Sequence, residues 1–133
     1  MYILTHPQDN LKYINKYYSN ISSINSIMSK ILKLSSLNDF KSIDTAKIII
    51  IKIGAEWCIP CKTIYPLYSQ FAEYNKNDNI IYTTVDVDDA DAELLDFIEV
   101  KSLPTFNIYK NGVLDNSIIS SDKYTISTCF NNL

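Results

Sequence analysis

Apolar residues recur along this chain at spacings that predict helices, and they gather in short runs that predict strands. In residues 8–21 they repeat at steps of three and four, as in an amphipathic helix, at Leu11, Ile14, Tyr18 and Ile21. Residues 47–53 are nearly all isoleucine, a β-branched residue, and polar residues do not alternate with it. Because such a run has no polar face, we expect a strand that is covered on both sides at the centre of a sheet.

The rest of the chain alternates between the two kinds of element. Short β-rich runs predict strands at residues 30–34, 79–87, 105–110 and 113–119. Helical spacing predicts helices at residues 35–43, 58–74, 89–98 and 121–131. Between the last two strands lies Asn111-Gly112, a dipeptide that favours the tight turn of a β-hairpin. This order predicts an α/β fold in which a mixed central sheet carries helices on both faces.

Length and charge limit the organisation and the partners of the chain. Its 133 residues are enough for one ordinary domain, which we expect at residues 28–133, after an N-terminal helical extension at residues 1–27. All 12 basic residues are lysines, and they are scattered rather than clustered. Since nucleic-acid binding usually relies on arginine or on a basic stripe, we expect no nucleic-acid partner.

The N-terminus lacks the pattern of a secretory or membrane-spanning segment. Residues 1–7 carry no lysine or arginine, and the nearby apolar stretches are too short to cross a membrane. Three cysteines also cannot form the disulfide framework of a small secreted domain. We therefore expect no membrane partner and a cytoplasmic location. The heavy use of Asn, Ile, Lys and Tyr is typical of an AT-rich genome, such as that of a parasite or a large virus. If the source is a large virus, we expect the protein to be packaged in the virion instead.

The candidate chemistry lies in the segment Trp57-Cys58-Ile59-Pro60-Cys61-Lys62, which follows the central strand and begins a helix. At a helix start, Cys58 meets free N–H groups and the positive end of the helix dipole. Both lower the pKa of its thiol and favour the nucleophilic thiolate. Cys61 lies three residues on, close enough to form a disulfide with Cys58 and to act as the resolving thiol. Pro60 is tolerated in a first helical turn and stiffens the loop between the sulfurs.

A cysteine pair with this spacing is also typical of half a zinc site or of two buried thiols. Zinc needs two more ligands, and only Cys129 and His6 remain, both distant in sequence. We therefore expect no metal and no cofactor besides the redox-active disulfide of Cys58 and Cys61. Cys129 is expected to be a small core residue on the last helix, with a regulatory or intermolecular disulfide as the alternative.

The wider sequence resembles the thioredoxin family, whose signature is Trp-Cys-Gly-Pro-Cys-Lys. Further matching segments are Ala55-Glu56-Trp57-Cys58, Pro66, Val85-Asp86-Val87-Asp88, Leu103-Pro104-Thr105-Phe106 and Lys110-Asn111-Gly112. Together these segments cover roughly residues 28–133. The resemblance implies a thioredoxin-like three-layer fold with a cis peptide bond before Pro104, which would pack beside the cysteines.

The resemblance also implies a thiol-disulfide oxidoreductase that reduces protein disulfides. Cys58 would attack a substrate disulfide, and Cys61 would then release the substrate. The substrate-binding residues would be Trp57, Ile59, Pro60, Leu103 and Pro104, with the backbone of Leu103 pairing with an extended peptide. An external electron donor, a thioredoxin reductase or its equivalent, would restore the dithiol. The alternatives are a disulfide oxidase or isomerase on the same fold, and a binding module without turnover.

Two departures from the family pattern bear on this chemistry. Lys52 lies six residues before Cys58, where the family carries a buried carboxylate. A charged lysine there would favour thiolates and a more oxidising couple, so we expect Lys52, together with Lys62, to tune the cysteines and to make Cys58 unusually acidic. The alternative is that Lys52 reaches solvent from a strand edge. Ile59 replaces a glycine, which would narrow the range of substrates.

The helix predicted at residues 8–21 has two interpretations. Its apolar stripe either packs on the chain's own domain or offers a face to a partner or to a second copy. We therefore expect a monomer, or a weak dimer formed through this helix.

Overall fold

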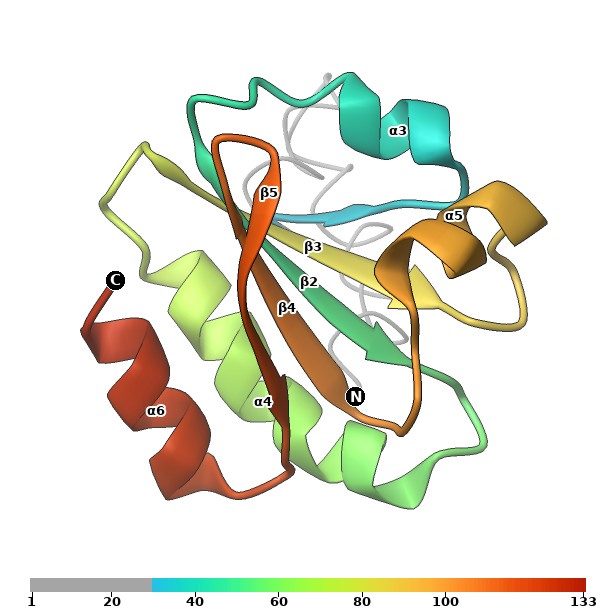
Figure 1. Ribbon diagram of the computed structural model, residues 1–133. Helices are drawn as coiled ribbons and strands as arrows, with labels where there is room; N and C mark the ends of the chain where they lie inside the picture. Colours follow the sequence, from blue (N-terminus) through green and yellow to red (C-terminus); the bar gives the residue numbers. More distant parts are fainter. Residues whose placement is uncertain (1–29) are drawn as a thin grey trace, which may run out of the picture.

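The computed structural model describes residues 30–133 as one mixed β-sheet with helices on both faces (Figure 1). The strands are β1 (Ile31–Lys33), β2 (Ile48–Gly54), β3 (Ile80–Asp86), β4 (Thr105–Lys110) and β5 (Val113–Ile119). The helices are α3 (Leu37–Lys41), α4 (Ile59–Glu73), α5 (Ala92–Ile98) and α6 (Lys123–Asn131). The helix predicted at residues 8–21 and the extension predicted at residues 1–27 lie outside the described residues, as does His6.

The sheet has the strand order β1-β3-β2-β4-β5. β1, β3 and β2 run parallel, whereas β4 and β5 are antiparallel to their neighbours. β4 and β5 form the predicted hairpin, and both residues of its turn, Asn111 and Gly112, have positive φ angles of 53° and 75°. Such angles are those of the tight turn that Asn-Gly favours. The predicted α/β fold with a mixed sheet is therefore confirmed.

The central strand β2 is buried on both faces, as its run of isoleucines predicts. Its side chains alternate between two apolar cores. Ile49, Ile51 and Ile53 point toward α3 and α5, and Ile50 points toward α4 and α6. All four isoleucines are fully buried. Helices α4 and α6 therefore cover one face of the sheet, and α3 and α5 cover the other (Figure 1).

Side-chain caps decide where the helices begin, and all four begin slightly later than predicted. Ser36 caps α3 in a reciprocal capping box with Asp39, Asp91 caps α5, and Asp122 caps α6. Each cap accepts a hydrogen bond from an N–H group of the first helical turn, which fixes the starting point. The largest difference is at α5, predicted from residue 89, because the backbone of Asp89 and Ala90 instead bonds to the Asp86 carbonyl in a turn.

The hydroxyl of Tyr68 links α4 to the strands beneath it. Tyr68 is fully buried, and its hydroxyl oxygen lies 2.6 Å from the Thr83 carbonyl and 3.2 Å from the Ile50 carbonyl. It also accepts a hydrogen bond from the Thr83 N–H at 3.1 Å. Burial raises the pKa of this phenol well above its ordinary value, so it stays protonated and able to donate.

Removing this hydroxyl should destabilise the fold. Tyr68→Phe removes the hydroxyl that bonds the buried Thr83 backbone, while the Ile50 carbonyl keeps its bond from the Thr83 hydroxyl at 2.9 Å. We therefore expect the free energy of unfolding to fall by about 1–3 kcal/mol. Urea denaturation measures the change. Tyr124→Phe makes the same substitution at a ring that is 78% exposed and should leave the stability unchanged. Equal stability of the two variants would contradict the structural role of the Tyr68 hydroxyl.

None of the helices in residues 30–133 is long and apolar enough to span a membrane.

Candidate active site

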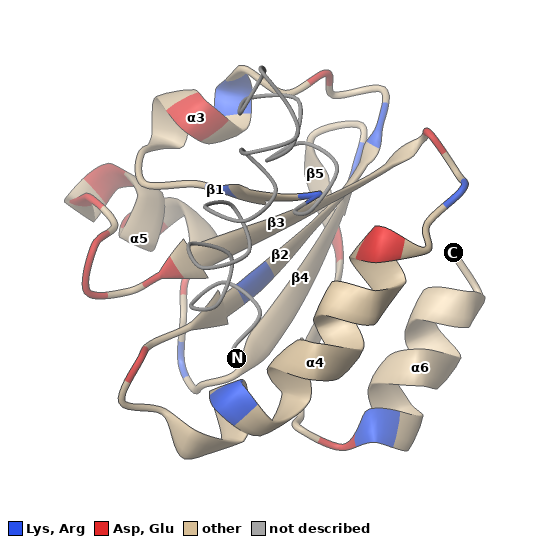
Figure 2. Cartoon of the chain, turned by 180° about the vertical axis from the view of Figure 1, so that it is seen from behind, with Lys and Arg blue, Asp and Glu red and all other residues tan. Residues whose placement is uncertain are grey.

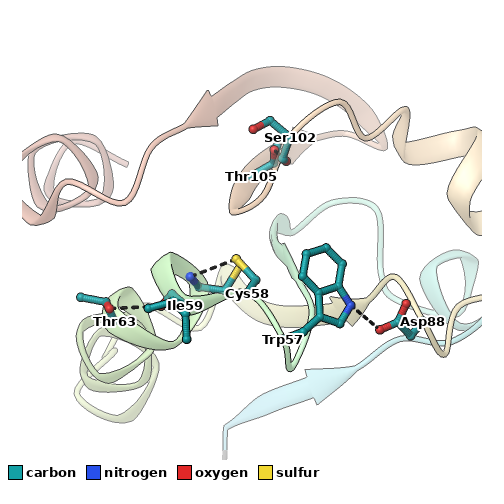
Figure 3. Close-up of a disulfide and its surroundings, with 8 residues drawn as sticks. Trp57, Cys58, Ile59, Thr63, Asp88, Ser102 and Thr105 are labelled. Atoms are coloured by element: carbon teal, nitrogen blue, oxygen red, sulfur yellow. Dashed lines mark hydrogen bonds between the residues drawn. A yellow bond between two sulfur atoms is a disulfide. The ribbon is translucent and has the colours of Figure 1, made fainter.

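The two cysteines lie where β2 gives way to α4. Cys58 is the N-terminal capping residue of α4, and Cys61 follows in the first turn, with Pro60 between them. They form a disulfide, and their Cα atoms are 5.3 Å apart. The Cys58 sulfur accepts a hydrogen bond from the Cys61 N–H at 3.2 Å (Figure 3). Because helix-terminal N–H groups and the helix dipole favour negative charge, this position stabilises a Cys58 thiolate in the reduced protein.

The disulfide is partly covered by neighbouring loops. Cys58 is 6% exposed and Cys61 is 2% exposed. The peptide bond between Leu103 and Pro104 is cis, and the half-buried Leu103 packs against a small cluster formed by Ala55 and the two cysteines. The loop between Ser102 and Thr105, which carries Leu103 and Pro104, lies across from Cys58 and the start of α4 (Figure 3). The structure therefore brings the predicted residues from two distant parts of the sequence to one place.

Exposed apolar side chains flank the disulfide. Trp57 is 66% exposed and Ile59 is 68% exposed, although both are large apolar residues. The indole N–H of Trp57 donates a hydrogen bond to the Asp88 carboxylate at 2.8 Å (Figure 3). Pro60 is also exposed. An apolar surface that remains open to solvent beside a reactive bond is typical of a binding site for another molecule.

Asp88 is a site residue that the sequence analysis did not assign. It follows β3, and Trp57 follows β2, which is parallel to β3. The carboxyl ends of neighbouring parallel strands meet at one edge of a sheet. A correct prediction that β2 and β3 are parallel neighbours would therefore have placed Asp88 near Trp57.

The resemblance to the thioredoxin family implies that Trp57 binds the substrate, so loss of the Asp88 carboxylate should weaken substrate binding more than turnover. In Asp88→Ala the Trp57 indole loses its acceptor, and an exposed hydrogen bond of about 0.5 kcal/mol predicts a two- to threefold rise in KM for a protein disulfide. We expect kcat to stay nearly unchanged. Asp96→Ala removes an exposed carboxylate of α5 as the matched control, and steady-state kinetics compare the two. A lower kcat with an unchanged KM in Asp88→Ala would contradict the binding role.

Acidic residues surround the same edge of the sheet. A surface hollow of about 520 Å³ beside the disulfide is lined by Glu56, Trp57, Lys62, Asp86, Asp88 and Asp89. Acidic residues also gather on α5 and on the loop that joins it to β3 (Figure 2). The exposed ammonium of Lys62 is thus outnumbered by carboxylates. The resulting negative potential attracts cationic segments of other molecules and repels anionic ones.

Lys52 is buried on the central strand, so the alternative that it reaches solvent from a strand edge is wrong. It is 6% exposed, because α4 covers the face of β2 on which it lies and both strand neighbours are present. Its ammonium lies 5.3 Å from the centre of the Tyr65 ring. Burial lowers the pKa of Lys52 to about 8, and the nearby Asp86 carboxylate acts in the opposite direction.

Cys129 lies on α6 and is half-buried against the core between α4 and the sheet. Burial raises the pKa of its thiol, which makes it a poor nucleophile at neutral pH. Within residues 30–133, no three metal-ligating side chains lie together. The alternative zinc site therefore finds no ligand set in this part of the chain.

Comparisons with known sequences give one consistent result. The family model described as Thioredoxin matches residues 30–130. A thioredoxin of Coprinus comatus is 33% identical over 90 residues, which is 67% of this chain and 84% of that protein. Thioredoxin of Homo sapiens is 33% identical over 87 residues, or 65% of this chain and 80% of that protein.

Comparisons with solved structures agree. The thioredoxin of Malassezia sympodialis superposes with a TM-score of 0.72 at 25% identity, over 78% of this chain and 90% of that chain. The thioredoxin of Plasmodium falciparum gives a TM-score of 0.68 at 27% identity, over 77% of this chain and 98% of that chain. Because the matched region includes the sheet, the helix that begins at Cys58 and the loop at Pro104, the chain belongs to the thioredoxin family.

Proposed function

We propose that this protein reduces protein disulfides by dithiol-disulfide exchange, with Cys58 as the attacking sulfur and Cys61 as the resolving sulfur. The observation that carries the proposal is a disulfide at the N-terminus of α4 beside an exposed apolar surface. Thiol-disulfide exchange needs a sulfur that is stabilised as thiolate and a second sulfur within bonding distance of it. The capping position of Cys58 and the bond to Cys61 meet both needs.

The assignment of roles rests on the surroundings of the two sulfurs. Cys58 lies next to the exposed Trp57 and Ile59, whereas Cys61 faces inward, where a β-carbon built at Gly54 would lie 3.2 Å from its sulfur. A substrate disulfide therefore reaches Cys58 first. The Cys58 thiolate attacks one substrate sulfur and the other leaves as a thiolate. Cys61 then attacks Cys58, which closes the enzyme disulfide and releases the reduced substrate.

The proposed substrate-binding residues are Trp57, Ile59, Pro60, Leu103 and Pro104. Leu103 packs against the cysteine cluster, and we propose that an extended peptide lies between its backbone and the exposed ring of Trp57. Ile59 projects beside Cys58, and we propose that its bulk restricts which segments can approach.

Turnover needs an external reductant, because each cycle leaves the enzyme as the disulfide. We propose a reductase that accepts this protein as its substrate, of the thioredoxin reductase type. The proposed location is a reducing compartment such as the cytoplasm. Support comes from the cysteine content of the chain, whose third cysteine, Cys129, has no cysteine left to pair with once Cys58 and Cys61 are joined.

The insulin reduction assay tests the proposed function. Full-length protein with dithiothreitol as the electron source should precipitate the insulin B chain much faster than dithiothreitol alone. NADPH with a thioredoxin reductase should replace dithiothreitol if the proposed donor is right. Failure with both donors would overturn the reductase proposal in favour of a binding module.

The buried Lys52 is the one observation that favours the second candidate function, a disulfide oxidase or isomerase. A cation near the cysteines stabilises the thiolate form and so makes the disulfide a stronger oxidant. The refolding of reduced ribonuclease A, with the oxidised protein as the only oxidant, tests this candidate. Rapid recovery of ribonuclease activity together with slow insulin reduction would favour oxidation.

The apolar residues at helical spacing in residues 8–21 are compatible, from sequence alone, with two arrangements. They either pack on the chain's own domain or contact a second copy of the chain. We propose the monomer or weak dimer that follows from these alternatives. Light scattering of the full chain and of a chain that lacks residues 1–27 separates them. Loss of a dimer on deletion favours contact between copies, and an unchanged monomer contradicts it.

A further inference from the structure

Lys52 is a buried cation that forms no ion pair at contact distance among the described residues, although the Asp86 carboxylate acts on it from farther away. The ion pairs in residues 30–133 join Lys33 to Asp89 and Lys110 to Asp115, both at the surface. Within the same residues, the Lys52 ammonium forms no hydrogen bond and lies over the Tyr65 ring, 5.3 Å from its centre. A buried charge without a partner is unfavourable, and the oxidised protein therefore holds Lys52 in a costly environment.

The ammonium of Lys52 lies close to the sulfur of Cys61. Gly54 at the end of β2 neighbours both atoms, since a β-carbon built on it would be 3.2 Å from the Lys52 Nζ and 3.2 Å from the Cys61 Sγ. The two atoms are therefore no more than twice that distance apart. Because Gly54 has no side chain, no side-chain atom of this residue separates them. At this range, a direct contact after a small movement or one bridging water can transfer a proton.

We propose that Lys52 and Cys61 share a proton in the reduced protein, so that the lysine generates and holds the thiolate that resolves the mixed disulfide. This proposal rests on the exchange function of the cysteine pair. It assigns the main effect of Lys52 to Cys61, the sulfur next to it, whereas the sequence analysis expected an effect on Cys58.

The resolving step moves one proton and exchanges one disulfide bond for another. The neutral form of Lys52 accepts the proton of the Cys61 thiol and becomes the ammonium, and the resulting thiolate attacks the Cys58 sulfur of the mixed disulfide. The bond between Cys58 and Cys61 forms, and the bond between Cys58 and the substrate sulfur breaks. The substrate leaves as a thiolate and takes up the proton, from Lys52 or from water. Over the full cycle the enzyme dithiol loses two electrons and two protons, and the substrate disulfide gains them.

The groups that face Lys52 fit this role. From α4 these are Cys61 and Tyr65, and from β3 the titratable group is Asp86. The neighbour on β4 is Phe106, which does not titrate. Burial lowers the pKa of Lys52 to about 8, so both its charged and its neutral form are accessible near neutral pH. The Tyr65 ring contacts the charged form and stabilises it once the proton has arrived.

This arrangement also biases the redox equilibrium. In the disulfide neither sulfur carries a charge, so the ammonium form of Lys52 has no counter-ion at the cysteines and only the more distant attraction of Asp86. Reduction produces a Cys61 thiolate that becomes its counter-ion. Lys52 therefore stabilises the dithiol relative to the disulfide, and the pair becomes a stronger oxidant than it would be with an uncharged residue at this position.

Alkylation of Cys61 tests the proposal directly. In a Cys58→Ser background, the rate of iodoacetamide addition to Cys61 is followed by mass spectrometry as a function of pH. Lys52→Met removes the charge and keeps a side chain of similar length, and we expect about a tenfold lower rate at pH 7, because the pKa of Cys61 rises by about one unit. Lys62→Met, which removes an exposed charge adjacent in sequence to Cys61, should change the rate much less.

The redox equilibrium provides the second measurement. With both cysteines present, Lys52→Met should shift the equilibrium with glutathione about tenfold toward the protein disulfide, which is a potential about 30 mV more negative. Circular dichroism verifies that each variant is folded. Equal rates of Cys61 alkylation and equal redox potentials with lysine or methionine at position 52 would overturn the proposal. Insulin reduction by the wild type would still support the exchange function in that case. Failure of insulin reduction with altered Cys61 rates would instead overturn the function alone.

Discussion

Replacing Cys58 with serine should lower the rate of insulin reduction by about a thousandfold or more, to that of dithiothreitol alone. The serine hydroxyl is not ionised near neutral pH, so no nucleophile remains at the start of α4 to attack a disulfide. The turbidity assay measures this loss. Cys129→Ser makes the same substitution at the half-buried cysteine of α6 and should retain nearly full activity.

Two further variants, Cys61→Ser and Cys129→Ser, separate the roles of the three cysteines. Cys61→Ser should also lose turnover, since its mixed disulfides cannot be resolved, but it should still react once with a substrate. Activity retained in Cys58→Ser, or lost in Cys129→Ser, would contradict the placement of the chemistry at the start of α4.

Replacing Lys52 with methionine should stabilise the oxidised protein at pH 7. The pKa of Lys52 is lowered from 10.5 to about 8 by burial, and this difference corresponds to a penalty of about 3 kcal/mol for keeping the ammonium in the folded state. Loss of the contact with the Tyr65 ring offsets part of the gain. We therefore expect the free energy of unfolding to rise by about 2 kcal/mol, measured by urea denaturation without reductant.

The pH dependence of this difference has a definite sign. Between pH 8 and 10.5 the unfolded chain binds the lysine proton and the folded chain releases it, so the wild type gains stability as the pH rises through this range. The variant has no lysine there and lacks the gain. Its advantage should therefore be largest below pH 8 and should disappear near pH 10.5. A difference that is independent of pH would contradict a buried, ionisable Lys52.

The positions of the main elements could be predicted because local sequence and tertiary structure agree. The isoleucines of β2 have no polar face, and Asn111-Gly112 suits only a tight turn, so both features were evident without coordinates. The helix starts were less predictable, because several capping residues compete. At α5, Asp86, Asp89 and Asp91 are all possible caps, and only the turn that forms after β3 selects Asp91.

The candidate site was predictable where its chemistry depends on residues near in sequence. The spacing of Cys58 and Cys61 at a helix start is local, and the structure joins them. The contacts of Lys52 were not predictable, because they depend on strand order, on the face of β2 that α4 covers and on the missing side chain of Gly54. The bond between Asp88 and Trp57 depends in the same way on the pairing of β2 with β3.

Mass spectrometry of a trapped intermediate tests the central assignment most directly. Reduced Cys61→Ser is mixed with a peptide that contains one disulfide, quenched with acid and digested. We predict one peptide adduct per protein molecule, attached to Cys58, and no comparable adduct in a Cys58→Ser protein treated in the same way. Adducts attached mainly to Cys129, or adducts on Cys61 of the Cys58→Ser protein in equal yield, would contradict the assignment of Cys58 as the attacking sulfur.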